Sequence, residues 1–206
     1  MRPNHRLSLR PAVLVAVVLL TLATALPAAA QSWLVGGRVA YADPSGDAYE
    51  AVYDESLTLI GGQLELRWPT WFLRLAAEQG EADGELVFLD LNGNLGPSGI
   101  SSTLDLRLIH FTGGYHSAPD PWGWYFGGGL TSLDGDEEAF FFSESVSGTG
   151  YHVLGGVRVA LTDRWEIGGE LIYWTVSDVF EGGAGVVLND PDLAAIEAAA
   201  VVNFRF

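Results

Sequence analysis

The residues of this chain best suited to acid–base or nucleophilic chemistry are few and scattered. Three histidines, His110, His116 and His152, follow the first 30 residues, and the chain has no cysteine. A serine-type hydrolase needs a hydroxyl nucleophile, an imidazole base and an orienting acid within hydrogen-bond reach of one another. The spacing of the serines, histidines and acids defines no such set. We therefore expect that the chain is not an enzyme, that it binds no cofactor, and that its histidines lie at an interface or inside the fold.

Acidic residues are the other candidates for chemistry, as ligands of a divalent cation. The densest group is Asp134, Asp136, Glu137 and Glu138. A second segment, 90–94, resembles the start of an EF-hand loop, but Leu95 stands where that loop requires glycine and no glutamate closes it. Cation binding at these segments and a merely solvated acidic surface both remain open.

Other charges alternate with apolar residues along short segments, as in "QLELRW" (63–68). A period of two is typical of a strand with two different faces. We expect the charged set on one face to form an ion-pair network inside the protein: Arg38, Glu65, Arg67, Arg74, Glu78, Asp105, Arg107, Arg158, Glu166, Glu170, Glu197 and Arg205.

Eight segments show this alternation and predict eight strands, over 32–42, 57–68, 71–79, 103–115, 122–131, 151–161, 165–176 and 196–206. Short connections follow the second, fourth and sixth strands. Long connections, which hold 18 of the 26 acidic residues, follow the first, third, fifth and seventh. Short turns at one end and long loops at the other are typical of outer-membrane barrels.

The N-terminal residues predict export. Arg2, Arg6 and Arg10 precede an apolar run over 12–26, and the three alanines at 28–30 fit a peptidase site. This run of 15 residues is shorter than the ~20 that a helix needs to span a bilayer. We expect residues 1–30 to be a cleavable secretory signal peptide and residues 31–206 to be the mature barrel domain.

Composition limits the class of the mature domain. The net charge of −16 becomes −19 when the three signal-peptide arginines are removed, and the chain has no lysine, so nucleic acid is not an expected partner. Apolar residues make up 49% of the chain, yet no long apolar helix follows residue 30. A closed β-barrel is the remaining way to cross a membrane.

We therefore expect an all-β, eight-stranded, antiparallel, up-and-down transmembrane β-barrel of a bacterial outer membrane, surrounded by outer-membrane lipid, with both termini in the periplasm. A soluble lipocalin-like barrel, whose apolar face points inward, is the alternative.

Aromatic residues favour the membrane barrel. The residues expected in a membrane-interface girdle are Trp33, Trp68, Trp71, Trp122, Trp165 and Phe206 near the short turns, and Tyr41, Tyr151 and Tyr173 near the long connections. Two such belts match the two interfaces of a bilayer. A final strand that ends in Phe206 also resembles the signal read by the outer-membrane assembly machinery, which is therefore an expected partner.

The segments "SWLVGGRVAYADPSGD" (32–47), "WGWYFGGGLT" (122–131) and "GYHVLGGVRVALTDRWEIGGELIYWTVSD" (150–178) resemble the small OmpW-type outer-membrane barrels, and OmpX- and OmpA-type barrels share several of these features. The resemblance implies the same fold and a lumen that passes small hydrophobic compounds. The ionic inner face and the absence of that family's proline-rich start of the fourth strand depart from its pattern.

Two functions remain open from the sequence. One is a narrow channel for small solutes, hydrophobic ones included. The other is a plugged structural barrel whose acidic loops bind cations or surface partners. Eight strands enclose a lumen only just wide enough for side chains to fill, which favours the plug.

Overall fold

The computed structural model describes residues 31–53, 56–89, 95–117, 121–139, 142–177, 179 and 192–206. The expected signal peptide and the 90–94 segment lie outside these residues.

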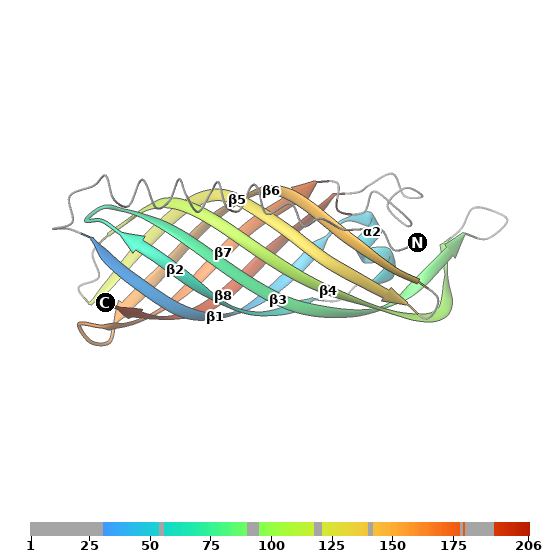
Figure 1. The fold of residues 1–206 in the computed structure, drawn as a ribbon, viewed down its shortest axis with the longest axis horizontal. Coiled ribbons are helices and arrows are strands. Elements are labelled where there is room, and N and C mark those ends of the chain that lie inside the picture. Colours follow the sequence, from blue (N-terminus) through green and yellow to red (C-terminus); the bar gives the residue numbers. More distant parts are fainter. Residues whose placement is uncertain are drawn as a thin grey trace, which may run out of the picture. The chain divides into compact units, whose positions relative to one another are not determined.

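The described residues form eight strands and one short helix, in the order β1 (Ser32–Ser45), α2 (Asp47–Val52), β2 (Leu57–Arg67), β3 (Trp71–Leu89), β4 (Leu95–His116), β5 (Trp122–Ala139), β6 (Phe142–Ala160), β7 (Trp165–Ser177) and β8 (Leu193–Arg205). Each strand pairs antiparallel with the next, and β1 also pairs with β8 (Figure 1). The prediction of an eight-stranded up-and-down barrel is confirmed. Among the described residues, no helix is long and apolar enough to cross a membrane.

The barrel has two unlike ends. At the short-turn end, β2 connects to β3, β4 to β5 and β6 to β7; at the long-hairpin end, β3 connects to β4 and β5 to β6. The last two hairpins are mostly strand, because β3–β4 pairing continues to Leu89–Leu95 and β5–β6 pairing to Ala139–Phe142.

The predicted loops at these two positions were therefore wrong. The predicted strands were too short because each was recognised by its apolar outer face, and that face ends where contact with lipid would end. Backbone pairing does not depend on that face and continues beyond it with polar residues outside.

The outer face carries a band of exposed aliphatic residues, including Val39, Ile60, Leu130, Val153 and Ile196. The inner face has two parts. Charged residues fill the half nearer the short turns: on β7, Glu166 and Glu170 precede the buried Trp174 and Val176. We call the two parts the ionic layer and the apolar layer. The apolar layer comprises Leu57, Leu59, Leu104, Leu106, Leu108, Leu133, Val146, Ile172, Trp174, Val176 and Leu193.

Candidate functional site

The ionic layer is the largest cluster of polar side chains in the described barrel. Its members are Arg38, Glu65, Arg67, Arg74, Glu78, Arg158, Glu166, Glu170, Glu197 and Arg205. All are buried except Arg205, whose side chain is partly exposed. They come from β1, β2, β3, β6, β7 and β8 because alternate residues of every strand point inward.

Arg38 on β1 is the centre of the upper part of this layer, next to the apolar layer. Its Nη2 donates to Glu197 Oε1 at 2.5 Å, and its Nε lies 3.0 Å from Glu78 Oε1. Its Nη1 lies 3.6 Å from Glu170 Oε2. One guanidinium therefore connects β1 with β3, β7 and β8.

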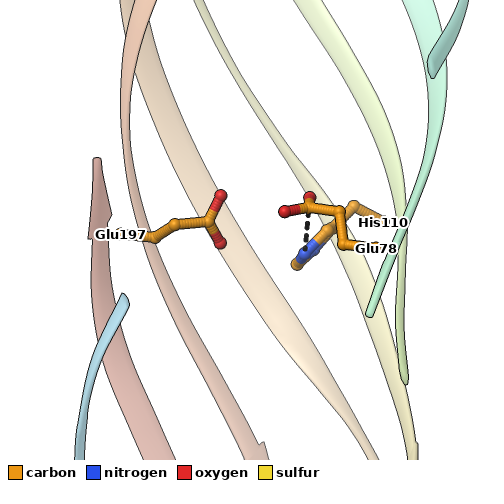
Figure 2. Close-up of side chains that lie close together, drawn as sticks. All are labelled: Glu78, His110 and Glu197. Carbon is orange, nitrogen blue, oxygen red and sulfur yellow. Dashed lines mark ion pairs between the residues drawn. The ribbon is translucent and has the colours of Figure 1, made fainter. Parts of the chain in front are cut away.

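His110 on β4 lies beside the Arg38 cluster, with its Nε2 3.8 Å from Glu78 Oε1 (Figure 2). Its Nδ1 is 3.0 Å from the hydroxyl oxygen of Thr131. That hydroxyl is 3.0 Å from His152 Nδ1, and His152 Nε2 is 2.9 Å from the hydroxyl of Thr112. The four side chains form one buried hydrogen-bonded chain.

Arg74 on β3 holds the middle of the layer. Its Nη2 donates to Glu65 Oε2 at 2.8 Å and its Nη1 to Glu170 Oε1 at 2.5 Å. The Tyr125 hydroxyl donates to the same Glu170 oxygen at 2.7 Å, and the Arg74 guanidinium lies 5.2 Å from the Tyr125 ring centre. Gly156 makes room for this ring, because a Cβ there would lie 2.4 Å from Tyr125 Cζ.

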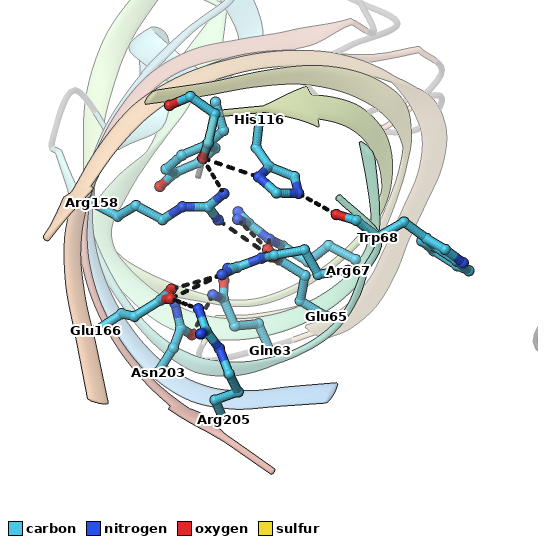
Figure 3. A network of polar contacts seen from close by, with 12 residues as sticks. Gln63, Glu65, Arg67, Trp68, His116, Arg158, Glu166, Asn203 and Arg205 are labelled. Carbon is cyan, nitrogen blue, oxygen red and sulfur yellow. Dashed lines mark hydrogen bonds and ion pairs between the residues drawn. The ribbon is translucent and has the colours of Figure 1, made fainter. Parts of the chain in front are cut away.

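The lower part of the layer lies at the short-turn end (Figure 3). Arg67 donates to Glu65 at 2.7 Å and to both oxygens of Glu166 at 3.0 Å. Arg205 also donates to Glu166, and Arg158 Nη1 lies 3.5 Å from Glu65 Oε1. These contacts join β2 to β6 and β7 across the interior.

The charges of the ionic layer balance one another. Five arginines and five glutamates of the described interior offset one another in charge. Buried ions are tolerated only when paired and hydrogen-bonded, and removing one partner leaves a charge that is costly to bury. These ion pairs therefore connect strands across the barrel interior, and their charged groups are used in pairing.

Ten of the twelve charged residues predicted to face inward are the members of this layer. The placement of Asp105 and Arg107 inside was wrong, because both side chains are exposed on β4. Their neighbours Leu104, Leu106 and Leu108 are fully buried in the apolar layer. At that height the outside of the barrel is polar and the inside is apolar, which reverses the pattern seen lower down.

Most of the expected girdle residues are exposed on the outer face. Trp33, Trp122, Trp165 and Phe206 are exposed near the short turns, and Tyr41, Tyr151 and Tyr173 farther along the strands. Trp68 differs, since only 6% of it is exposed. Its ring stacks on the half-buried Trp71 with 3.6 Å between ring centres.

The acidic group at 134–138 lies on β5 and not in a loop. Asp134 and Glu138 are exposed, while Glu137 is half-buried on the opposite face. Glu137 accepts a hydrogen bond from Tyr53 at 2.7 Å. Alternation along the strand therefore separates Glu137 from the other three carboxylates, which share the outer face of β5.

Sequence reasoning missed α2 and the apolar layer. Tyr49, Val52 and Tyr53 belong to the same buried apolar cluster as that layer, and the Tyr49 and Tyr53 rings lie 5.3 Å apart. The signal that could have predicted the apolar layer was the period-two run of leucines at 104, 106 and 108. These leucines face the interior at a height beyond the lipid-facing band.

The hydrogen bond from Tyr53 to Glu137 is expected to stabilise the long-hairpin end of the barrel, and this can be tested. Burial raises the pKa of its hydroxyl above the ordinary value of 10.0, and the nearby Glu137 carboxylate raises it further. A raised pKa in the folded state stabilises the fold below about pH 10 and loses that contribution as the pH rises above it. Tyr53→Phe should cost about 1–3 kcal/mol at pH 8 and weaken the loss of stability between pH 9 and 11.

Urea unfolding followed by tryptophan fluorescence measures both effects. Tyr115→Phe is the control, because the Tyr115 ring is 60% exposed and its loss of a hydroxyl should leave stability at pH 8 unchanged. If Tyr53→Phe and the unaltered protein were equally stable at pH 8 and at pH 11, the buried Tyr53–Glu137 hydrogen bond would not stabilise this end of the barrel.

Comparison with known proteins agrees with the geometry. The sequence matches the outer membrane protein beta-barrel domain family over residues 14–206. The chain belongs to this family. It is therefore an outer-membrane β-barrel protein with a membrane-lipid environment. No curated protein sequence matches it.

Solved structures show the same fold at low sequence identity. Neisserial surface protein A has a TM-score of 0.56 and 17% identity, covering 84% of this chain and 97% of its own. Ail of Yersinia pestis, in complex with a heparin analogue, has a TM-score of 0.54 and 16% identity, covering 86% and 99%. OprG of Pseudomonas aeruginosa has a TM-score of 0.54 and 12% identity, covering 86% and 96%. The outer-membrane barrel is thus similar to several small barrels, and the OmpW-type resemblance is not distinguished among them.

Proposed function

We propose that this protein is a closed outer-membrane barrel that acts through the acidic surface of its long-hairpin end, and that it is not an open channel. The observation that carries the proposal is the ionic layer. Arg38 and Arg74 each contact glutamates on other strands, and Glu170 of β7 contacts both arginines. Water and solutes have to displace paired, buried charges in order to pass.

The apolar layer supports the proposal as a second barrier. Leu57, Leu104 and Leu133 are fully buried from three different strands, and Trp174 is fully buried beside them. A solute that entered from the long-hairpin end would meet close-packed apolar side chains. A hydrophobic solute that passed them would then meet the ionic layer, so a channel for small hydrophobic compounds has no continuous apolar path through the described interior.

The outer face of the long-hairpin end suits cationic partners. Glu81 on β3, Asp105 on β4 and Asp136 on β5 lie opposite one another in register. Like charges directly opposite on neighbouring strands are destabilising, so divalent cations or basic groups of a partner would relieve their repulsion. The Ail structure holds the heparin analogue sucrose octasulfate; the acidic face of this chain should repel such an anionic ligand.

We place the short-turn end, with both ends of the barrel sequence, on the periplasmic side. Short periplasmic turns and longer external hairpins are the usual arrangement in bacterial barrels. The acidic hairpins would then face outward from the cell. We propose no enzymatic activity, because His110 and His152 are buried, and Nδ1 of His110 and both ring nitrogens of His152 contact threonine hydroxyls.

Conductance through planar bilayers tests the closed barrel. The refolded protein should show no reproducible unitary conductance, and Glu170→Gln should be equally silent because the apolar layer remains. Arg107→Gln is the matched control, since this residue is exposed on the outer face. A steady conductance that changes with Glu170→Gln and not with Arg107→Gln would replace this proposal with a gated channel.

A further inference from the structure

Three side chains that commonly bind metal ions converge inside the barrel. Glu78 on β3, His110 on β4 and Glu197 on β8 each offer a ligand atom, and these atoms lie within 4.8 Å of one another. Glu197 reaches across the lumen toward the other two (Figure 2). The three residues are 4%, 2% and 0% exposed, respectively. Their strands are fixed by the barrel, so the convergence is built into the fold.

The ligand atoms in this cluster have free bonding capacity. Arg38 contacts Oε1 of Glu78 and Oε1 of Glu197. Among the described residues, Glu78 Oε2, Glu197 Oε2 and His110 Nε2 are buried without a hydrogen bond of good geometry. Buried polar atoms nearly always have partners, so these three atoms, on side chains whose ligand atoms converge within 4.8 Å, require an explanation.

His110 is held in the orientation that a metal ligand needs. Its Nδ1 is bonded to the Thr131 hydroxyl, which is bonded in turn to His152. If Nδ1 donates its proton to Thr131, the lone pair of Nε2 is left facing the carboxylates. Metal-bound histidines almost always have such an outer partner on the second ring nitrogen. In the opposite tautomer, Nε2 would carry the proton, and Glu78 Oε1, at 3.8 Å from Nε2, is too far away to accept a hydrogen bond.

The local charge also favours a cation. Glu78 and Glu197 share the single guanidinium of Arg38, and Arg74 is occupied by Glu65 and Glu170. Two carboxylates against one cation in a buried space leave negative charge to be neutralised. A dication supplies that charge and uses the free oxygens.

The geometry points to a binding site for a first-row transition-metal dication of the zinc class, formed by His110 Nε2 and one oxygen each of Glu78 and Glu197. An imidazole with two carboxylates suits such ions, whereas calcium and magnesium prefer oxygen ligands alone. The site lies where the ionic layer meets the apolar layer and would tie β3, β4 and β8 together. It is independent of whether the lumen conducts.

Zinc binding to the refolded full barrel tests the site. The protein is refolded in detergent with Zn²⁺, dialysed, and analysed for bound metal by mass spectrometry. We expect one Zn²⁺ per barrel, and a loss of at least tenfold in affinity for each of Glu78→Gln, Glu197→Gln and His110→Asn. Thr131→Val should lower affinity by about 10–100-fold, because it removes the partner of His110 Nδ1. Glu166→Gln is the matched control, a buried luminal glutamate outside the cluster, and should bind zinc as the unaltered protein does.

X-ray absorption of the zinc-loaded unaltered protein tests the ligands without relying on any variant that folds poorly. One imidazole and oxygen neighbours at about 2.0–2.2 Å are expected. The proposal is overturned if no zinc remains after dialysis, if the three ligand variants bind as tightly as Glu166→Gln, or if the spectrum shows no imidazole. In those cases a shared proton would be the occupant of the Glu78–Glu197 pair.

Discussion

Replacing Arg38 with methionine should lower the free energy of unfolding by about 3–5 kcal/mol, as expected when one partner of a buried ion pair is removed. Arg38 contacts Glu78, Glu170 and Glu197, and both side chains of each pair are almost fully buried. Glu170 keeps Arg74 as a partner. Glu78 and Glu197 keep no arginine among the described residues, so their charges become uncompensated.

Urea unfolding in lipid vesicles, followed by tryptophan fluorescence with a chelator present, measures this loss. Adding Glu78→Gln and Glu197→Gln to Arg38→Met should recover at least half of it, because the neutral amides remove the stranded charges. Arg107→Met is the matched control and should change stability by less than about 0.5 kcal/mol, since Arg107 is exposed. Equal losses for Arg38→Met and Arg107→Met would show that the ionic layer does not stabilise the barrel.

Replacing Trp174 with alanine should cost about 3–5 kcal/mol, the usual range for deleting a buried aromatic side chain. Trp174 is 0% exposed and is among the largest fully buried side chains of the apolar layer. Its ring fills space between strands whose positions are fixed by barrel closure, so the walls cannot collapse into the cavity. The same unfolding measurement detects the loss as a lower urea midpoint.

The neighbouring Tyr173 provides the control for this prediction. It is 46% exposed on the outer face of the same strand, so Tyr173→Ala removes an aromatic ring from the lipid side without opening a cavity. Its cost should be well below that of Trp174→Ala. A larger loss from Tyr173→Ala would mean that lipid contact, and not interior packing, dominates the stability of this region.

The strand number and the closed fold could be predicted from local pattern. A membrane strand meets lipid on one face and the lumen on the other, so each strand carries its own period-two signal. Exposed residues such as Val153 and Ile196 lie on the outer face, as that signal implied. The same signal placed ten charged residues inside before their partners were known.

The phase of β4 could not be determined in this way. In "TLDLRL" (103–108) leucines alternate with charges, and either set could face inward. The choice depends on what surrounds the strand at that height. Arg107 and Asp105 lie beyond the lipid-facing band, and the interior there is filled by α2 and the apolar layer. Those leucines face inward because β4 continues past the lipid-facing band to a height where the interior is apolar.

The partners within the ionic layer depended on the tertiary structure for a similar reason. Arg38 and Glu197 are separated by 159 positions in the chain and meet only because β1 pairs with β8. The convergence of Glu78, His110 and Glu197 depends on the stagger of three strands around the closed sheet. For the ten charges of the ionic layer, periodicity by itself determined the face that each one occupies, because that is a property of one strand. Closure of the barrel decided which charges touch, because contact across the lumen depends on the register of all eight strands together.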